Sequence, residues 1–272
     1  MTIEEYQIKE QCILNDTIKA IQNALVDRWN KTYIENIDRT EYEVAMGLLS
    51  HQVYLSVHYI SMPLLWNDGI GGIICRSIIE NIINLAWILR NEPQQRAQMY
   101  IEHGRGQEKL QIERLKDRLQ GLEENAEYYQ SLIKRIEQKE AQLSTVQYPF
   151  LIDVNIGSWS DKNLRILAKE SGKEDLYNNF FDVFSNVTHG TWNTIVKHSM
   201  KRSSSPLHRY KLRPYLSAPQ SNISWASVIT NWMEESFELF DNHFGYKSLS
   251  NIAATLKEAL TNLDNEYSST DK

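Results

Sequence analysis

The segment that most constrains the fold is residues 71–89, GGIICRSIIENIINLAWIL, which is apolar on nearly every face of a helix. A helix of this kind has to be enclosed by neighbouring helices, because side chains that point in all directions need partners in all directions. The segment therefore predicts a central helix inside a multi-helix bundle.

Helical spacing of apolar residues also dominates the rest of the chain. Glycine and proline are scarce, with 11 and 6 among 272 residues, whereas a β-rich chain of this length needs more turns. We expect no strand, and helices at about residues 3–30, 41–62, 70–91, 161–171, 173–199, 222–244 and 248–266. The predicted class is all-α, a multi-helix bundle from which a long charged helix or a helical hairpin protrudes.

Residues 93–143 are expected to form this long charged helical arm. From Ile112 onward, apolar residues recur at spacings of three and four, which is a heptad seam; they are Leu115, Leu119, Leu122, Ala126, Tyr129, Ile133 and Ile136. Gly121 weakens a helix by about 1 kcal/mol relative to alanine, so a hairpin that turns there is the alternative to one long helix. The arm either packs on its own domain or, through residues 108–143, binds a partner protein or a second copy.

We expect the 272 residues to form a single helical domain in a soluble, cytoplasmic protein. The acidic N-terminal segment does not resemble a signal peptide, and the two cysteines, Cys12 and Cys75, form no CxxC motif. No charged residue occurs between Glu43 and Asp68, but serine, histidine and glutamine side chains there favour a buried core helix over a membrane span.

The central helix carries a polar line, because Arg76, Glu80 and Asn84 are spaced four residues apart and share one face. Desolvation of such charges inside a core costs several kcal/mol per ion. The line therefore either borders a polar cleft or belongs to a buried network.

A second polar line is predicted on the helix at 173–199, where Ser185, His189 and Asn193 share a face and Asn186 lies beside them. Histidine can give or take a proton near neutral pH, which makes His189 a candidate general acid or base. The alternative is a hydrogen-bonded core histidine. If the two helices are neighbours, the two polar lines face each other across a cleft.

A basic loop is predicted at residues 197–220. No Asp or Glu occurs from Val183 to Met233, and this part of the chain has a charge of +6, although the whole chain carries −6. Its cations are Lys197, Lys201, Arg202, Arg209, Lys211 and Arg213. Cations interleaved with aromatic residues suit RNA or a nucleotide. The alternative is a solvated connector that pairs with the acidic remainder of the chain.

The segments CRSIIENIINLAWIL and FSNVTHG resemble a bacterial all-helical family of unknown function. Its motifs, Arg-x-x-x-Glu and Ser-x-x-x-His-Gly, are matched here within residues 45–200. That family is distantly similar to the HEPN domains of toxin–antitoxin and phage-defence systems, many of which are metal-independent ribonucleases that act as dimers. The HEPN signature has an arginine with four to six residues between it and the histidine, whereas Asp182, Val183 and Phe184 occupy those places before His189.

The resemblance implies a protein of bacterial antiviral defence that acts on RNA or a nucleotide without a metal or cofactor. If it is an enzyme, it is a metal-independent endoribonuclease in which His189 moves the proton, Arg76 holds the phosphate and Glu80 orients Arg76. The ligand-binding residues would be Ser185, Asn186 and Asn193 together with the six cations. The alternative is a non-catalytic helical module for protein interaction or dimerisation.

Overall fold

The computed structural model describes residues 1–35, 39–124, 127–144, 152–154, 156–208, 211–216, 220–248 and 251–270. Helices dominate these residues, which confirms the predicted all-α class. The chain divides into two compact units, one made of Met1–Asn91 with Leu164–Lys272 and the other of Glu92–Asn163.

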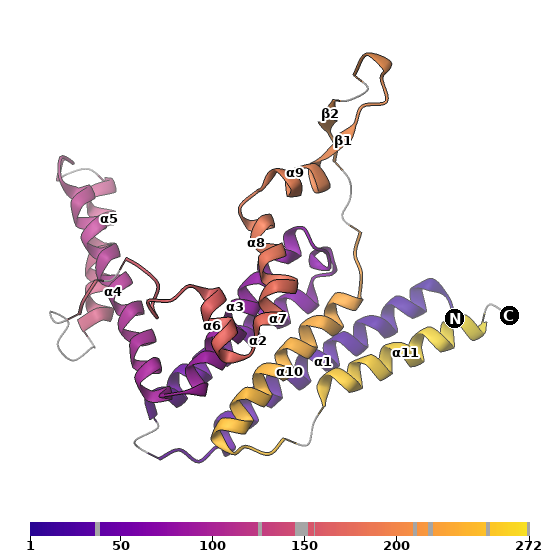
Figure 1. Cartoon of the computed structure of the whole chain (residues 1–272), viewed down its shortest axis with the longest axis horizontal. Helices are drawn as coiled ribbons and strands as arrows, with labels where there is room; N and C mark the ends of the chain where they lie inside the picture. Colours follow the sequence, from indigo (N-terminus) through magenta and orange to yellow (C-terminus); the bar gives the residue numbers. More distant parts are fainter. Residues whose placement is uncertain are drawn as a thin grey trace. The chain divides into compact units, whose positions relative to one another are not determined.

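The first unit contains most of the helices (Figure 1). They are α1 (Ile3–Lys31), α2 (Arg39–Ser61), α3 (Ile70–Arg90), α6 (Leu164–Ser171), α7 (Glu174–Leu176), α8 (Asp182–Thr188), α9 (Trp192–Ser199), α10 (Ser224–Phe244) and α11 (Ile252–Thr270). The same unit holds the 3-10 turns η2 (Pro63–Leu65) and η5 (Pro206–His208), the π-helical turn η4 (Tyr177–Phe181) and the strands β1 (Met200–Arg202) and β2 (Leu212–Pro214).

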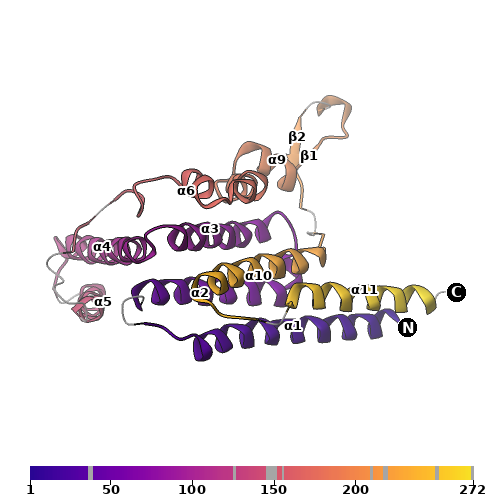
Figure 2. The same ribbon diagram turned by 60° about the horizontal axis from the view of Figure 1, so that its bottom comes forward.

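Helix α3 is the central helix of this unit, as its composition predicts. It packs against α2 and α10 on one side and against α6, η4 and α8 on the other (Figure 2). Ile78, Ile79, Ile82 and Ile83 have no exposed surface. The helix is long and apolar enough to cross a membrane, but 72% of its apolar window is buried inside the protein, as in the core helix of a soluble protein.

Two glycines let other segments approach the start of α3. A Cβ atom on Gly71 would lie 1.9 Å from the carbonyl oxygen of Leu65, and one on Gly72 would lie 2.8 Å from Cδ1 of Phe184. Because a real Cβ atom would not fit at either distance, the η2 turn and α8 can pack here only against glycine.

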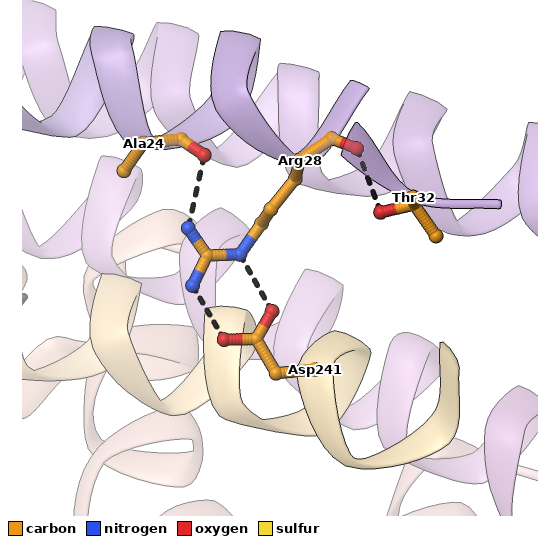
Figure 3. Close-up of polar contacts among 4 residues, drawn as sticks. All are labelled: Ala24, Arg28, Thr32 and Asp241. Carbon is orange, nitrogen blue, oxygen red and sulfur yellow. Dashed lines mark hydrogen bonds and ion pairs between the residues drawn. The ribbon is translucent and has the colours of Figure 1, made fainter. Parts of the chain in front are cut away.

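A buried ion pair joins α1 to α10 (Figure 3). Arg28 is 3% exposed and donates hydrogen bonds from Nε and Nη2 to the two carboxylate oxygens of Asp241, at 2.7 and 2.6 Å. Its Nη1 donates to the carbonyl oxygen of Ala24 at 2.9 Å, and its guanidinium lies 4.0 Å from the ring centroid of Phe237. The bidentate geometry offsets only part of the desolvation, because burial still raises the pKa of Asp241 despite the hydrogen bonds and charge of Arg28.

The second unit is a helical hairpin of α4 (Pro93–Leu119) and α5 (Glu127–Ser144). The chain turns at Gly121, which has φ +87°, so the hairpin and not the single long helix is formed. Its core contains Ile112, Leu115, Leu132, Ile136 and Leu143. The apolar residues of the heptad seam therefore pack α4 against α5 within the hairpin. Leu132 is buried in place of the predicted Ile133, because α5 starts a new helical register after the turn.

Two local predictions were wrong. The helix expected at 173–199 contains a π-helical turn and is interrupted at Gly190, whose φ of +57° ends α8. The loop expected at 197–220, where no strand was predicted, contains β1 and β2, which pair antiparallel. Strands of three residues are too short to produce an alternating pattern that could be recognised in the sequence.

Candidate nucleic-acid interface

His189 lies in the turn between α8 and α9 and is exposed. Its backbone N–H donates to the carbonyl oxygen of Ser185 at 3.0 Å, and the left-handed Gly190 then redirects the chain. Asn193 belongs to α9 and not to α8. The predicted line of Ser185, His189 and Asn193 on one helix is therefore wrong, because the glycine that follows His189 ends the helix.

Arg76 is half-buried in α3, and its guanidinium lies 5.0 Å from the ring centroid of Phe181. Its Nε is buried and has no hydrogen-bond partner among the described residues. Glu80 is exposed, and no ion pair in the described part of the chain joins it to Arg76. Phe181 precedes His189 by eight residues, which is about 12 Å of helix. Arg76 and His189 thus belong to neighbouring elements, but they are separated along the helix axis.

Two asparagines of α3, Asn81 beside the predicted polar line and Asn84 at its end, are buried in the core. Asn81 donates to the carbonyl oxygen of Leu48 at 2.6 Å and to Oε1 of Gln52 at 3.4 Å. Gln52 in turn donates to the carbonyl oxygen of Trp232 at 3.0 Å. Asn84 is also buried, and its Oδ1 has no partner among the described residues. Asn81 therefore links α3 to α2, Gln52 links α2 to α10, and neither asparagine borders a cleft.

An ion pair that the sequence did not predict holds α9 against the start of α3. Lys197 of α9 binds the carboxylate of Asp68, which lies in the loop before α3. Burial alone would raise the pKa of Asp68, but the hydrogen bond and charge of Lys197, with the charge of His198, outweigh it and lower this pKa. Asp68 is the only carboxylate between Glu43 and Glu80, which is the signal in the sequence that could have singled it out.

Three cations lie in the two strands and a fourth, Lys211, directly precedes β2; we call β1, Lys211, β2 and Tyr215 the basic hairpin. Lys201, Arg202, Lys211 and Arg213 are all exposed, and Lys201 lies directly opposite Arg213 in the strand register. The ammonium of Lys201 lies 4.0 Å from the ring centroid of Tyr215. Arg209 lies outside the described residues.

Large apolar side chains adjoin these cations along the chain. Trp192 and Ile195 of α9 are 63% and 39% exposed, while Leu207 and Leu216 are 89% and 99% exposed. The hairpin contacts α9, and α9 contacts α8. Figure 1 shows the hairpin continuing directly from the end of α9. Cations, aromatic rings and aliphatic side chains are therefore all accessible on this part of the first unit.

The fold and these side chains define an all-helical protein with an exposed basic hairpin inserted between its helices. The chain belongs to a family of unknown function, DUF5677, which matches residues 42–205. This match confirms the predicted membership of a family of unknown function and includes both motif segments, 76–80 and 185–190. No curated protein and no solved structure matches the chain.

Proposed function

We propose that the protein binds RNA through the basic hairpin. The observation that carries this proposal is the position of Lys201 directly opposite Arg213 on paired strands. Like charges opposite each other destabilise a strand pair, and a polyanion that lies between them removes the repulsion. The surrounding segment from Val183 to Met233 contains no carboxylate that could do so locally.

The preferred ligand in this proposal is single-stranded RNA. Tyr215 and Trp192 are 40% and 63% exposed, so unpaired bases can stack on their rings, which contributes about 1–3 kcal/mol per base. A duplex keeps its bases stacked on each other and would use only the cations. The resemblance to HEPN domains supports RNA as the ligand and bacterial defence in the cytoplasm as the setting.

If the bound RNA is cleaved, we propose His189 as the general acid or base. Its side chain is exposed in the turn that leads into α9 and the basic hairpin, so a bound strand can reach it. Ser185, Asn186 and Asn193 from the same turn region would position the strand. Arg76 and Glu80 would act on a neighbouring nucleotide, since Arg76 contacts Phe181, two helical turns before His189.

The second candidate function is a non-catalytic interaction module. In this case a partner protein or a second copy binds the basic hairpin and the exposed apolar side chains beside it. The exposures of Leu207 and Leu216 favour it, because large apolar side chains in water are typical of binding surfaces. If this second function is correct, the buried hydrogen bonds of Asn81 contribute only to the stability of the fold.

RNA binding is tested by fluorescence anisotropy of a labelled single-stranded RNA at several salt concentrations. We expect the Lys201→Gln/Arg213→Gln protein to bind more weakly and to lower the salt slope by about 1.4, since each phosphate contact on a single strand contributes about 0.7. The matched control, Lys169→Gln/Lys257→Gln, changes the net charge equally at exposed helical positions and should bind as the unchanged protein does. Equal weakening by both pairs would overturn the proposed site.

Cleavage is tested separately with the same RNA in EDTA. We expect His189→Ala to abolish cleavage while it leaves RNA affinity and circular dichroism unchanged, and Arg76→Ala to reduce the rate. If the unchanged protein binds RNA but leaves it intact, RNA binding stands and the ribonuclease proposal fails.

A further inference from the structure

A groove of about 730 Å³ lies between α1 and α2. Its apolar lining comes from Leu25, Val26, Trp29, Ile34, Tyr42 and Met46. The volume falls within the range of small-molecule sites, which combine an apolar lining with a few polar groups. Neither the RNA proposal nor the buried networks use this groove.

Gly47 lines the groove in the interior of α2, and packing does not explain why this residue is a glycine. A Cβ atom added there would meet nothing within 4 Å, in contrast to Gly71, where it would collide with a backbone oxygen. Glycine is the poorest helix former after proline, so it weakens α2 without allowing a close contact within the protein. What its missing side chain provides is open space in the groove.

The charges around the groove favour a cation. Two carboxylates, Glu35 and Glu43, line it together with one guanidinium, Arg39, which leaves one net negative charge. No ion pair within the described residues involves any of the three.

An exposed aromatic wall lies beside these charges. Trp29 is 60% exposed and stacks on Tyr42, with ring centroids 5.9 Å apart and an interplanar angle of 26°. The face of an indole ring attracts cations, and its area also favours flat apolar ligands. The aromatic wall and the carboxylates therefore both favour a flat ligand that carries a positive charge.

We propose that this groove binds a planar organic cation. The flat body of the ligand lies against Trp29 and Met46, and its positive charge lies near Glu43 and Glu35. Gly47 leaves the room that the body needs. The proposal is independent of RNA binding.

The test uses rhodamine 6G, a planar aromatic cation, with binding followed by fluorescence anisotropy. We expect binding to the unchanged protein, at least tenfold weaker binding to Gly47→Leu, which fills the groove, and weaker binding to Glu43→Gln. The matched control is Gly104→Leu, since Gly104 is also a helical glycine with open space around it but lies in the second unit. This control should bind rhodamine 6G as the unchanged protein does.

Three results would overturn the proposal. The first is equal loss of affinity in Gly47→Leu and Gly104→Leu, and the second is binding of the anionic dye anilinonaphthalene sulfonate that is as tight as that of rhodamine 6G and independent of Glu43. The third is concentration-dependent self-association in sedimentation velocity that Gly47→Leu removes, because the occupant would then be a second copy. If Gly47→Leu fails to fold, the smaller Gly47→Ala, with a two- to fivefold expected loss of affinity, decides in the same way.

Discussion

Lys197 of α9 forms an ion pair with Asp68 in the loop before α3, although 129 residues separate them in the sequence. Helix α9 in turn contacts β1, so this pair contributes to the placement of the basic hairpin on the helical unit. Both side chains are exposed, so the pair contributes little to the stability of the whole fold. Its main effect is to fix the position of α9.

Removal of this ion pair should loosen α9 without unfolding the protein. In Asp68→Asn, we expect faster amide hydrogen exchange in residues 192–202 and unchanged exchange in α3, because α3 is held by its own buried core. Hydrogen exchange with mass spectrometry measures both regions in one experiment. Asp16→Asn is the matched control, since it removes an exposed carboxylate that, among the described residues, pairs with Lys19 on its own helix. Faster exchange throughout the unit would contradict the local role.

The same pair should respond to acid. Because the pKa of Asp68 is lowered in the folded protein, its contribution is fully present above its unfolded pKa of about 3.9. It is lost as the pH falls through the lower, folded value. Hydrogen exchange in α9 should therefore become insensitive to Asp68→Asn at the acid end of a pH series, provided the rest of the unit remains folded. A difference between the two proteins that stays constant as the pH falls would contradict this explanation.

The ion pair of Arg28 and Asp241 predicts a larger effect on global stability. Arg28→Ala leaves a buried carboxylate without its partner and should lower the free energy of unfolding by about 3–5 kcal/mol. Replacement of both residues by apolar ones, Arg28→Met with Asp241→Leu, should recover most of that loss, since neither charge then remains desolvated. Urea unfolding followed by circular dichroism measures both variants. A double variant as unstable as Arg28→Ala would show that packing, and not the unpaired charge, causes the loss.

Replacement by alanine should lower the stability of the protein at two glycines and raise it at a third. Gly71→Ala and Gly72→Ala place a Cβ atom against Leu65 and Phe184, and each should destabilise the protein by about 1–3 kcal/mol. Gly47→Ala adds a methyl group in open space and should stabilise it by up to about 1 kcal/mol. Thermal unfolding of the three variants is the measurement. Destabilisation by Gly47→Ala would mean that the groove is not open space in solution.

The two thiols should differ sharply in reactivity. Cys75 has no exposed surface, and burial raises the pKa of its thiol to about 12, whereas Cys12 is exposed on α1. Because the thiolate is the reactive form, Ellman's reagent at pH 8 should titrate one thiol in the folded protein and two in urea. Cys12→Ser should react only after unfolding, and rapid reaction of this variant in buffer would contradict the buried position of Cys75.

Much of the fold was predictable because local spacing encodes it. The periodic isoleucines and leucines of α3 place it at the centre of the bundle whatever its neighbours are, and α1, α2 and α10 begin and end close to the predicted residues. The charged arm was expected as a helix or a hairpin, and Gly121 marked the turn at which the hairpin forms.

The candidate site was less predictable. A spacing of four residues shows that Arg76 and Glu80 share a face but not what each side chain contacts; one lies against Phe181, and the other is exposed. The left-handed backbone of Gly190 ends α8 and moves Asn193 to another helix, which the spacing of Ser185, His189 and Asn193 does not show.

The sequence by itself therefore determined which segments become helices and which of them is central, since both depend on the periodicity of neighbouring residues. Only the tertiary structure decided that Lys197 binds Asp68, that Lys201 lies opposite Arg213, and that Gly47 opens onto a groove. These relationships join residues that are distant in the chain, or depend on the space around them, and neither property is expressed in local sequence periodicity.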